Sequence, residues 1–77
     1  MENAKLTNCI KVFRAKFNIS QRELAEGIGV TRKTINTIET GRFVPSTILS
    51  MKIARYFKTT VEEVFELQET TNEVGEE

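Results

Sequence analysis

The 77 residues are enough for one small domain, whose hydrophobic core must be small and whose stability is expected to be marginal. The only cysteine, Cys9, cannot form an internal disulfide, and without any His the sequence offers no zinc site. Because no apolar run approaches the roughly 20 residues of a membrane span and nothing suggests secretion, we expect a cytoplasmic protein with no membrane partner. No cofactor, metal or small-molecule ligand is indicated.

Charge is unevenly distributed along the chain. Residues 1–58 contain eleven Lys or Arg and four Glu, a net charge of +7, whereas residues 59–77 contain seven Glu and no basic residue, a net charge of −7. The zero net charge of the whole chain therefore conceals a basic body that can bind a polyanion. We interpret the acidic end as a solubilising extension, with competition against the polyanion for the basic body as the alternative.

The hydrophobic pattern predicts an all-α domain of five short helices over residues 1–68. The first helix is expected over residues 6–17, because its apolar residues recur on one helical face. These residues are Ile10, Phe13 and Phe17. Residues 69–77 are polar, acidic and aperiodic, so we expect them to form a disordered tail.

Recognisable start and stop signals surround the other four helices. The start signals are the capping boxes Ser20–Glu23 and Thr60–Glu63, the cap Thr31 and the pair Pro45-Ser46. Gly29 and Gly41 end the second and third helices, since glycine readily adopts the left-handed conformation of a helix end. The predicted helices cover residues 21–28, 32–40, 46–57 and 61–67. Short strand pairing between residues 5–8 and 66–69 is left open as an alternative for the two ends.

The segment over residues 20–40 carries the pattern that points to a function. Only residues 29–31 separate the second and third helices, so these helices must cross steeply, and Ala25 supplies the small side chain that a close crossing needs. The apolar lining of the crossing is expected to be Leu24, Ile28, Val30, Ile35 and Ile38. This is the geometry of a helix-turn-helix, whose second helix enters the major groove of DNA. The outward face of that helix then presents residues that can hydrogen-bond base edges and phosphates: Arg32, Lys33, Asn36 and Thr37.

With these motifs the chain resembles the lambda-repressor-like DNA-binding domains, also called the Cro or xenobiotic-response-element (XRE) family. The segments that carry the resemblance are Ser-Gln-Arg-Glu-Leu-Ala (20–25), Gly-Val-Thr-Arg (29–32), Thr-Ile-Asn-Thr-Ile-Glu-Thr-Gly (34–41), Pro45 and Ile-Ala (53–54). It covers roughly residues 10–65 and is closest to the short stand-alone regulators of that family. It implies a compact five-helix domain that binds double-stranded DNA through its second and third helices.

The resemblance also implies roles for single residues. Gln21 would contact a phosphate, Thr31, Asn36 and Arg42 would help to position the DNA backbone, and Arg32 and Lys33 would reach bases. Arg14 and Glu39 match a salt bridge between the first and third helices, and each directly follows an apolar core residue. The sequence departs from the family at Thr47 and Ser50, where larger apolar residues are usual.

The fourth predicted helix is apolar around nearly its whole circumference, although a surface helix needs only one apolar stripe. Burial between the third and fifth helices is one explanation. The other is that its spare face and the fifth helix together form a homodimer interface. A homodimer would let a repressor of this size read a palindromic operator. The residues expected at or near that interface are Phe43, Tyr56 and Val61.

Other functions are weighed against this hypothesis. A protein-binding module on the same fold, an antitoxin or a bridging coactivator, would need a partner-binding segment, and the tail is the only candidate. An enzyme is not indicated, because the chain has no His, no Asp and no glycine-rich phosphate loop.

Cys9 is interpreted as a partly buried filler, with a redox sensor as the alternative.

Overall fold

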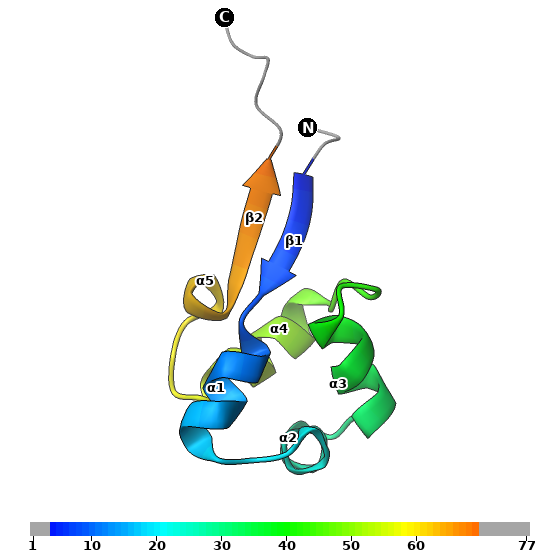
Figure 1. Ribbon diagram of the computed structural model, residues 1–77, viewed down its shortest axis with the longest axis vertical. Helices are drawn as coiled ribbons and strands as arrows, with labels where there is room; N and C mark the ends of the chain where they lie inside the picture. Colours follow the sequence, from blue (N-terminus) through cyan, green and yellow to red (C-terminus); the bar gives the residue numbers. More distant parts are fainter. Residues whose placement is uncertain (1–3, 70–77) are drawn as a thin grey trace, which may run out of the picture.

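The computed structural model describes residues 4–69, in which five helices are joined to one two-stranded antiparallel sheet. The elements in chain order are β1 (Ala4–Asn8), α1 (Ile10–Phe17), α2 (Gln21–Ile28), α3 (Arg32–Glu39), α4 (Thr47–Tyr56), α5 (Val61–Val64) and β2 (Phe65–Glu69). Figure 1 shows the helices gathered into one body, with the β1–β2 ribbon extending from the end opposite α2. The expected disordered tail, apart from Glu69 itself, lies outside the described residues.

The predicted capping signals are made as hydrogen bonds. Ser20 and Glu23 form a complete capping box: the Glu23 N–H donates to Ser20 Oγ at 3.0 Å and the Ser20 N–H donates to Glu23 Oε1 at 2.8 Å. At the starts of α3, α4 and α5 the side chains of Thr31, Ser46 and Thr60 each accept one backbone N–H. Of the predicted Thr60–Glu63 capping box, the described residues make only the bond from the Glu63 N–H to Thr60 Oγ1, at 3.2 Å. Gly29 and Gly41 both have a φ of +82°, so the chain turns after α2 and after α3 where glycine was expected to allow it.

Both ends of the all-α prediction were wrong. The first helix begins at Ile10 instead of residue 6, and the fifth ends at Val64 instead of residue 67; the segments beyond them pair as β1 and β2, the alternative left open for the two ends. Leu6 lies opposite Leu67 in this pairing, and Asn8 lies opposite Phe65. Pairing satisfies the backbone groups that the two segments turn towards each other.

The side chain of Asn8 marks the change from β1 to α1. Its Oδ1 accepts a hydrogen bond from the Ile10 N–H at 3.1 Å, and its Nδ2 donates to the carbonyl of Ile38 at 3.0 Å. Asn8 therefore closes the turn that leads into α1 and ties this turn to the last turn of α3. The domain is mostly helical with a short terminal sheet, so the five predicted helices are present and the strand pairing left open for the two ends is formed.

The core lies where α2 crosses α3 and where α4 and the chain ends close over them. Its buried residues are Ile10, Leu24, Ala25, Ile28, Ile35, Ile38, Ile53, Ala54, Phe57, Val64 and Phe65. The small side chain at the crossing, Ala25, is 2% exposed, and Val30 in the turn is half-buried, as the steep crossing requires. Phe57 extends the core towards α1, where its ring stacks on Phe13 with ring centroids 5.3 Å apart.

The apolar residues of α4 are divided between core and surface. Ile53 and Ala54 are buried, whereas Ile48 and Met51 are 70% and 51% exposed. Burial between neighbouring helices therefore accounts for only part of its apolar circumference. A spare apolar face is left open to solvent.

One ion pair fixes α1 against α3. Arg14 Nε donates to Glu39 Oε2 at 2.6 Å, and Arg14 Nη2 donates to Glu39 Oε1 at 3.2 Å, a two-pronged contact. The third guanidinium nitrogen, Nη1, donates to the carbonyl of Ile19 in the α1–α2 turn at 3.2 Å. The side chains of Arg14 and Glu39 are only 16% and 8% exposed, so this is not an ordinary surface pair.

We expect Glu39→Ala to lower the free energy of unfolding by roughly 3 kcal/mol, because it leaves the Arg14 guanidinium poorly solvated and without its carboxylate. Arg14→Ala should have a loss of similar size, and the double variant should lose clearly less than the two single losses added together. Urea denaturation of the four proteins measures these differences. Glu62→Ala, at an exposed residue of α5, is the control and should stay within about 0.5 kcal/mol of the wild type. Small, strictly additive losses would show that the pair does not stabilise the fold.

Candidate nucleic-acid interface

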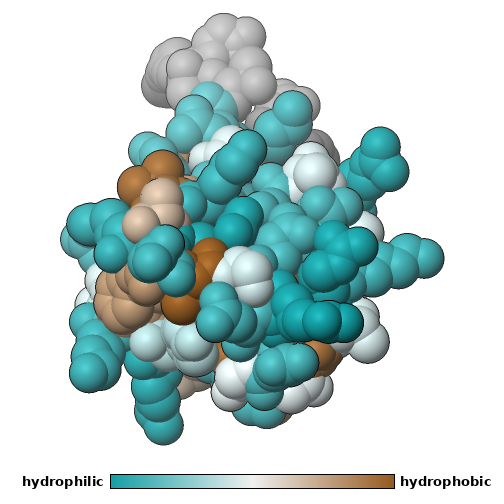
Figure 2. Space-filling view, turned by 60° about the horizontal axis from the view of Figure 1, so that its bottom comes forward, coloured by the Kyte–Doolittle hydropathy of each residue, from teal (hydrophilic) through white to brown (hydrophobic). Residues whose placement is uncertain are grey.

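The predicted reading residues lie on the outward side of α3. Arg32, Lys33 and Asn36 are exposed, and Thr37 is half-buried. Figure 2 keeps the left–right direction of Figure 1, and hydrophilic side chains cover most of the side on which α3 lies. This is the surface that a polyanion would meet.

The amide of Gln21 connects the start of α2 with the whole length of α3. Its Nε2 donates to Glu39 Oε1 at 3.0 Å and to Asn36 Oδ1 at 3.2 Å. Its Oε1 accepts from Arg32 Nη1 at 3.2 Å. Gln21 therefore holds one residue from the first, the middle and the last turn of α3.

This network connects site residues for which the sequence predicted separate roles. Because Glu39 also binds Arg14, a continuous chain of hydrogen bonds runs from α1 through Glu39 and Gln21 to Arg32. Sequence reasoning missed this central role of Gln21. The signal for it was weak: Gln21 precedes its three partners by 11, 15 and 18 residues, and these separations become meaningful only once the crossing angle is known.

Thr31 has a defined structural position at the start of α3. Its Oγ1 accepts from the Thr34 N–H at 3.2 Å and shares a hydrogen bond of 3.0 Å with Thr34 Oγ1. The side chain caps the helix. The N-terminal end of α3, where Arg32 and Lys33 follow directly, is thereby held in regular geometry.

Arg42 lies on the same side as Lys33. The backbone N–H groups of Arg42 and Phe43 both donate to the carbonyl of Thr37, at 2.9 Å and 3.2 Å. This double contact folds the α3–α4 loop back along α3. The resulting surface hollow has a volume of about 310 Å³ and is lined by Lys33, Thr34, Thr37, Arg42 and Phe43.

The three residues expected at a dimer interface line three different hollows. Phe43 lies in the hollow beside α3, Tyr56 in one between α2 and α4, and Val61 in one that it shares with Met51. Val61 is therefore the one of the three that borders the spare apolar face of α4.

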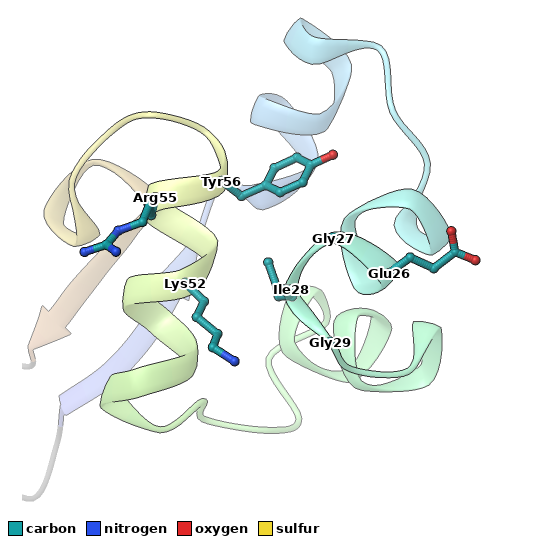
Figure 3. Close-up of a pocket in the computed structure, with 7 residues that line it drawn as sticks. All are labelled: Glu26, Gly27, Ile28, Gly29, Lys52, Arg55 and Tyr56. Atoms are coloured by element: carbon teal, nitrogen blue, oxygen red, sulfur yellow. The ribbon is translucent and has the colours of Figure 1, made fainter.

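The hollow between α2 and α4 has a volume of about 520 Å³, but its polar groups do not converge. Figure 3 shows the Tyr56 ring reaching towards α2 while the side chains of Arg55 and Glu26 point away from the hollow. The Tyr56 ring fits here because its neighbour on α2 is Gly27, where a Cβ atom would overlap the ring. A small-molecule site needs a few convergent polar groups, and this hollow lacks them among the described residues.

The described part of the chain offers little for other chemistry. Within residues 4–69 no three His, Cys, Asp or Glu residues gather as they would around a metal ion. Cys9 is half-buried, and its Sγ lies 3.2 Å from the carbonyl oxygen of Glu63, a packing position between α1 and α5. Over the same residues no helix combines the length and apolar character of a membrane span.

Comparisons with known proteins agree with this geometry. A family model described as helix-turn-helix matches residues 10–64. The chain is 45% identical over 64 residues to the HTH-type transcriptional regulator YgzD of Bacillus subtilis, covering 83% of this chain and 97% of that protein. It is 52% identical over 56 residues to an HTH-type transcriptional regulator of Archaeoglobus fulgidus, covering 73% of this chain and 79% of that one.

A solved structure extends the agreement to the fold. The chain matches a crystal structure of a protein from Bacteroides fragilis with a TM-score of 0.72 and 26% identity, covering 79% of this chain and 98% of that one. The family match spans every helix from α1 to α5. The resemblance predicted from the sequence motifs is confirmed, and the chain belongs to the XRE-type helix-turn-helix family.

Proposed function

We propose that this protein is a sequence-specific transcription regulator that inserts α3 into the major groove of DNA and acts as a homodimeric repressor. The observation that carries the proposal is the exposed N-terminal turn of α3, where Arg32 and Lys33 stand side by side. In a helix-turn-helix this end of the recognition helix reaches the base edges. The names of the relatives, HTH-type transcriptional regulators, support the same function.

The hydrogen-bond network beside α3 supports accurate placement of these side chains. Arg32 is held by Gln21, and Gln21 is held by Glu39, whose partner Arg14 comes from α1. A reading side chain with a supported position loses less conformational entropy when it binds a base. Asn36 accepts from Gln21 through Oδ1, so its Nδ2 group is the part available to donate to DNA.

The distribution of charge favours the same docking. The acidic residues after α4 that the structure describes lie on α5 and β2: Glu62, Glu63, Glu66 and Glu69. Figure 1 shows β2 projecting from the end of the molecule opposite α2. The acidic ribbon is thus kept away from the surface that would face the phosphates.

We assign base contact to Arg32, Lys33, Asn36 and Thr37, and backbone contact to Gln21, Thr31 and Arg42. Both side-chain amide hydrogens of Gln21 are donated within the protein, so its phosphate contact is assigned to its backbone N–H at the start of α2. Backbone contacts fix the register of the protein on the duplex, whereas base contacts carry the sequence preference. A protein bound in this way across a promoter would exclude the polymerase from it. Repression therefore needs nothing more than occupancy of the operator.

Selection of bound duplexes from a random DNA pool tests this assignment. The wild type should enrich an inverted repeat with half-site centres about 10 bp apart. Arg32→Ala and Lys33→Ala should each relax the preference at one matching position of both half-sites, because a good side-chain contact contributes about 1–3 kcal/mol of discrimination per base. Lys11→Ala, at an exposed position of α1, is the charge-matched control and should leave the motif unchanged. A motif unaltered by both Arg32→Ala and Lys33→Ala would place the reading residues elsewhere.

Salt dependence separates DNA binding from a protein-binding role of the same fold. Each neutralised phosphate contributes about −0.9 to the log–log slope of affinity against salt, so we expect a slope steeper than about −4 for the dimer. Arg42→Ala should weaken all sequences about equally and make the slope shallower by roughly 1 per half-site. Fluorescence anisotropy over a salt series measures both effects. No binding to any duplex, or a flat salt profile, would favour the antitoxin or coactivator hypothesis.

The spare apolar face of α4 is the surface that we assign to the homodimer. Ile48 and Met51 are 70% and 51% exposed, and Met51 shares a hollow with Val61 of α5. A two-fold contact through this face would be self-complementary, as a symmetric dimer requires. We therefore centre the interface on Met51 and Val61, with Phe43 and Tyr56 outside its middle.

Sedimentation at micromolar concentration should show a dimer for the wild type and a monomer for Met51→Asp, since dimerisation would have to remove a carboxylate at the middle of the contact from water. The exposure of Met51 makes the substitution harmless to the monomer fold, which circular dichroism can verify. The matched control is Val12→Asp on α1, where Val12 is 58% exposed. It should remain dimeric. A wild type that stays monomeric both alone and on DNA would refute the dimer.

A further inference from the structure

We propose that the hollow between α3 and the α3–α4 loop receives the 5-methyl group of a thymine, so that Phe43 and Thr37 read a base through apolar contact. This inference rests on the proposed docking of α3 in the major groove. The hollow is lined by Lys33, Thr34, Thr37, Arg42 and Phe43 and has a volume of about 310 Å³. It adds Phe43 to the reading residues and changes the way in which Thr37 reads.

The two threonines offer methyl groups more readily than hydroxyls. Thr37 Oγ1 donates to the carbonyl of Thr34 at 2.9 Å, and Thr34 Oγ1 shares a hydrogen bond of 3.0 Å with Thr31 Oγ1. Both hydroxyls are therefore already engaged within α3. The chemistry left for a ligand at Thr34 and Thr37 is mainly that of their γ-methyl groups.

Phe43 is held beside Thr37 by its own backbone. The Phe43 N–H donates to the Thr37 carbonyl at 3.2 Å, next to the Arg42 N–H at 2.9 Å. Its side chain is nevertheless 46% exposed, although Phe is among the residues that bury most readily. An aromatic ring in a fixed place, open to solvent and adjoining two threonines, is an apolar surface without a partner in the described chain.

The charges around this surface indicate what covers it. Lys33 and Arg42 both line the hollow, and both are exposed. An apolar peptide would have to desolvate these two cations, whereas DNA presents phosphates to them. Among the four bases only thymine places a methyl group in the major groove, and Thr methyl and Phe are side chains that contact it. Charge complementarity therefore favours thymine in duplex DNA as the occupant.

Deoxyuridine provides the test because it differs from thymidine only by the absence of this methyl group. The duplex enriched from the random pool is resynthesised with deoxyuridine in place of thymidine at one position at a time. We expect one position in each half-site to lose affinity by about fourfold, the effect of exposing one methyl-sized group. Deoxyuridine at every other position should leave the affinity unchanged. The salt slope should not change for any of these duplexes, because no charge is altered.

Two variants assign the effect to the hollow. Phe43→Ala should abolish the preference for thymine over uracil at that position while leaving the salt slope unchanged. Thr37→Ser should weaken the preference, because serine keeps the hydroxyl that donates to Thr34 but lacks the methyl group. The matched controls are Val44→Ala, next to Phe43 and outside the hollow, and Thr40→Ser, whose hydroxyl also donates within α3. Both should retain the full preference.

The outcomes separate this inference from the proposed function. Tight binding of the wild type to DNA with a steep salt slope, but with the same affinity for thymine and uracil at every position, is one such outcome. This result would overturn the methyl contact and leave the proposed regulator function standing. A uracil effect that survives both Phe43→Ala and Thr37→Ser would place the methyl contact elsewhere and also overturn the inference. Failure of the wild type to bind any duplex would overturn both proposals. Capture of an apolar peptide at Phe43 by a protein that still binds DNA would overturn only the methyl contact.

Discussion

The carboxylate of Glu39 is the meeting point of three helices. One of its oxygens, Oε1, accepts from both Arg14 Nη2 of α1, at 3.2 Å, and Gln21 Nε2 of α2, at 3.0 Å. A carboxylate side chain only 8% exposed has lost most of its water, and these two groups donate hydrogen bonds in place of that water. Because Gln21 in turn holds Arg32, the Glu39 carboxylate links the exposed side of α3 to α1 and α2. Ile35 and Ile38 hold the buried side of α3 in the core.

Local signals in the sequence were sufficient to predict the helix-turn-helix itself. Ser20 with Glu23, Gly29 and Thr31 act through neighbouring backbone groups, so their effect can be read without knowledge of the fold. The two chain ends could not be assigned in the same way. Leu6 pairs with Leu67 far along the chain, and such a pairing leaves no local periodicity strong enough to separate a short strand from a helix turn.

In the candidate site, too, some features followed from local sequence signals and others did not. Exposure of Arg32 and Lys33 followed from the helical period, because the apolar residues of α3 define which face is buried. The positions of Gln21 and Phe43 did not follow. The first depends on the angle at which α2 crosses α3, and the second on the return of the loop after Gly41 to the Thr37 carbonyl. Both are tertiary contacts between side chains or loops whose sequence separation carries no characteristic pattern.

The terminal ribbon also has a kinetic consequence. Pairing Ala4 with Glu69 closes nearly the whole described chain into a single loop, and the entropic cost of closure rises with loop length. The α2–α3 crossing, in contrast, joins neighbours in sequence and can form early. Packing of the helices brings the Cys9 N–H to the carbonyl of Val64, at 2.9 Å, and thereby places the two strands at the start of their register. We therefore expect the helices that carry the reading surface to assemble first and the ribbon to close afterwards.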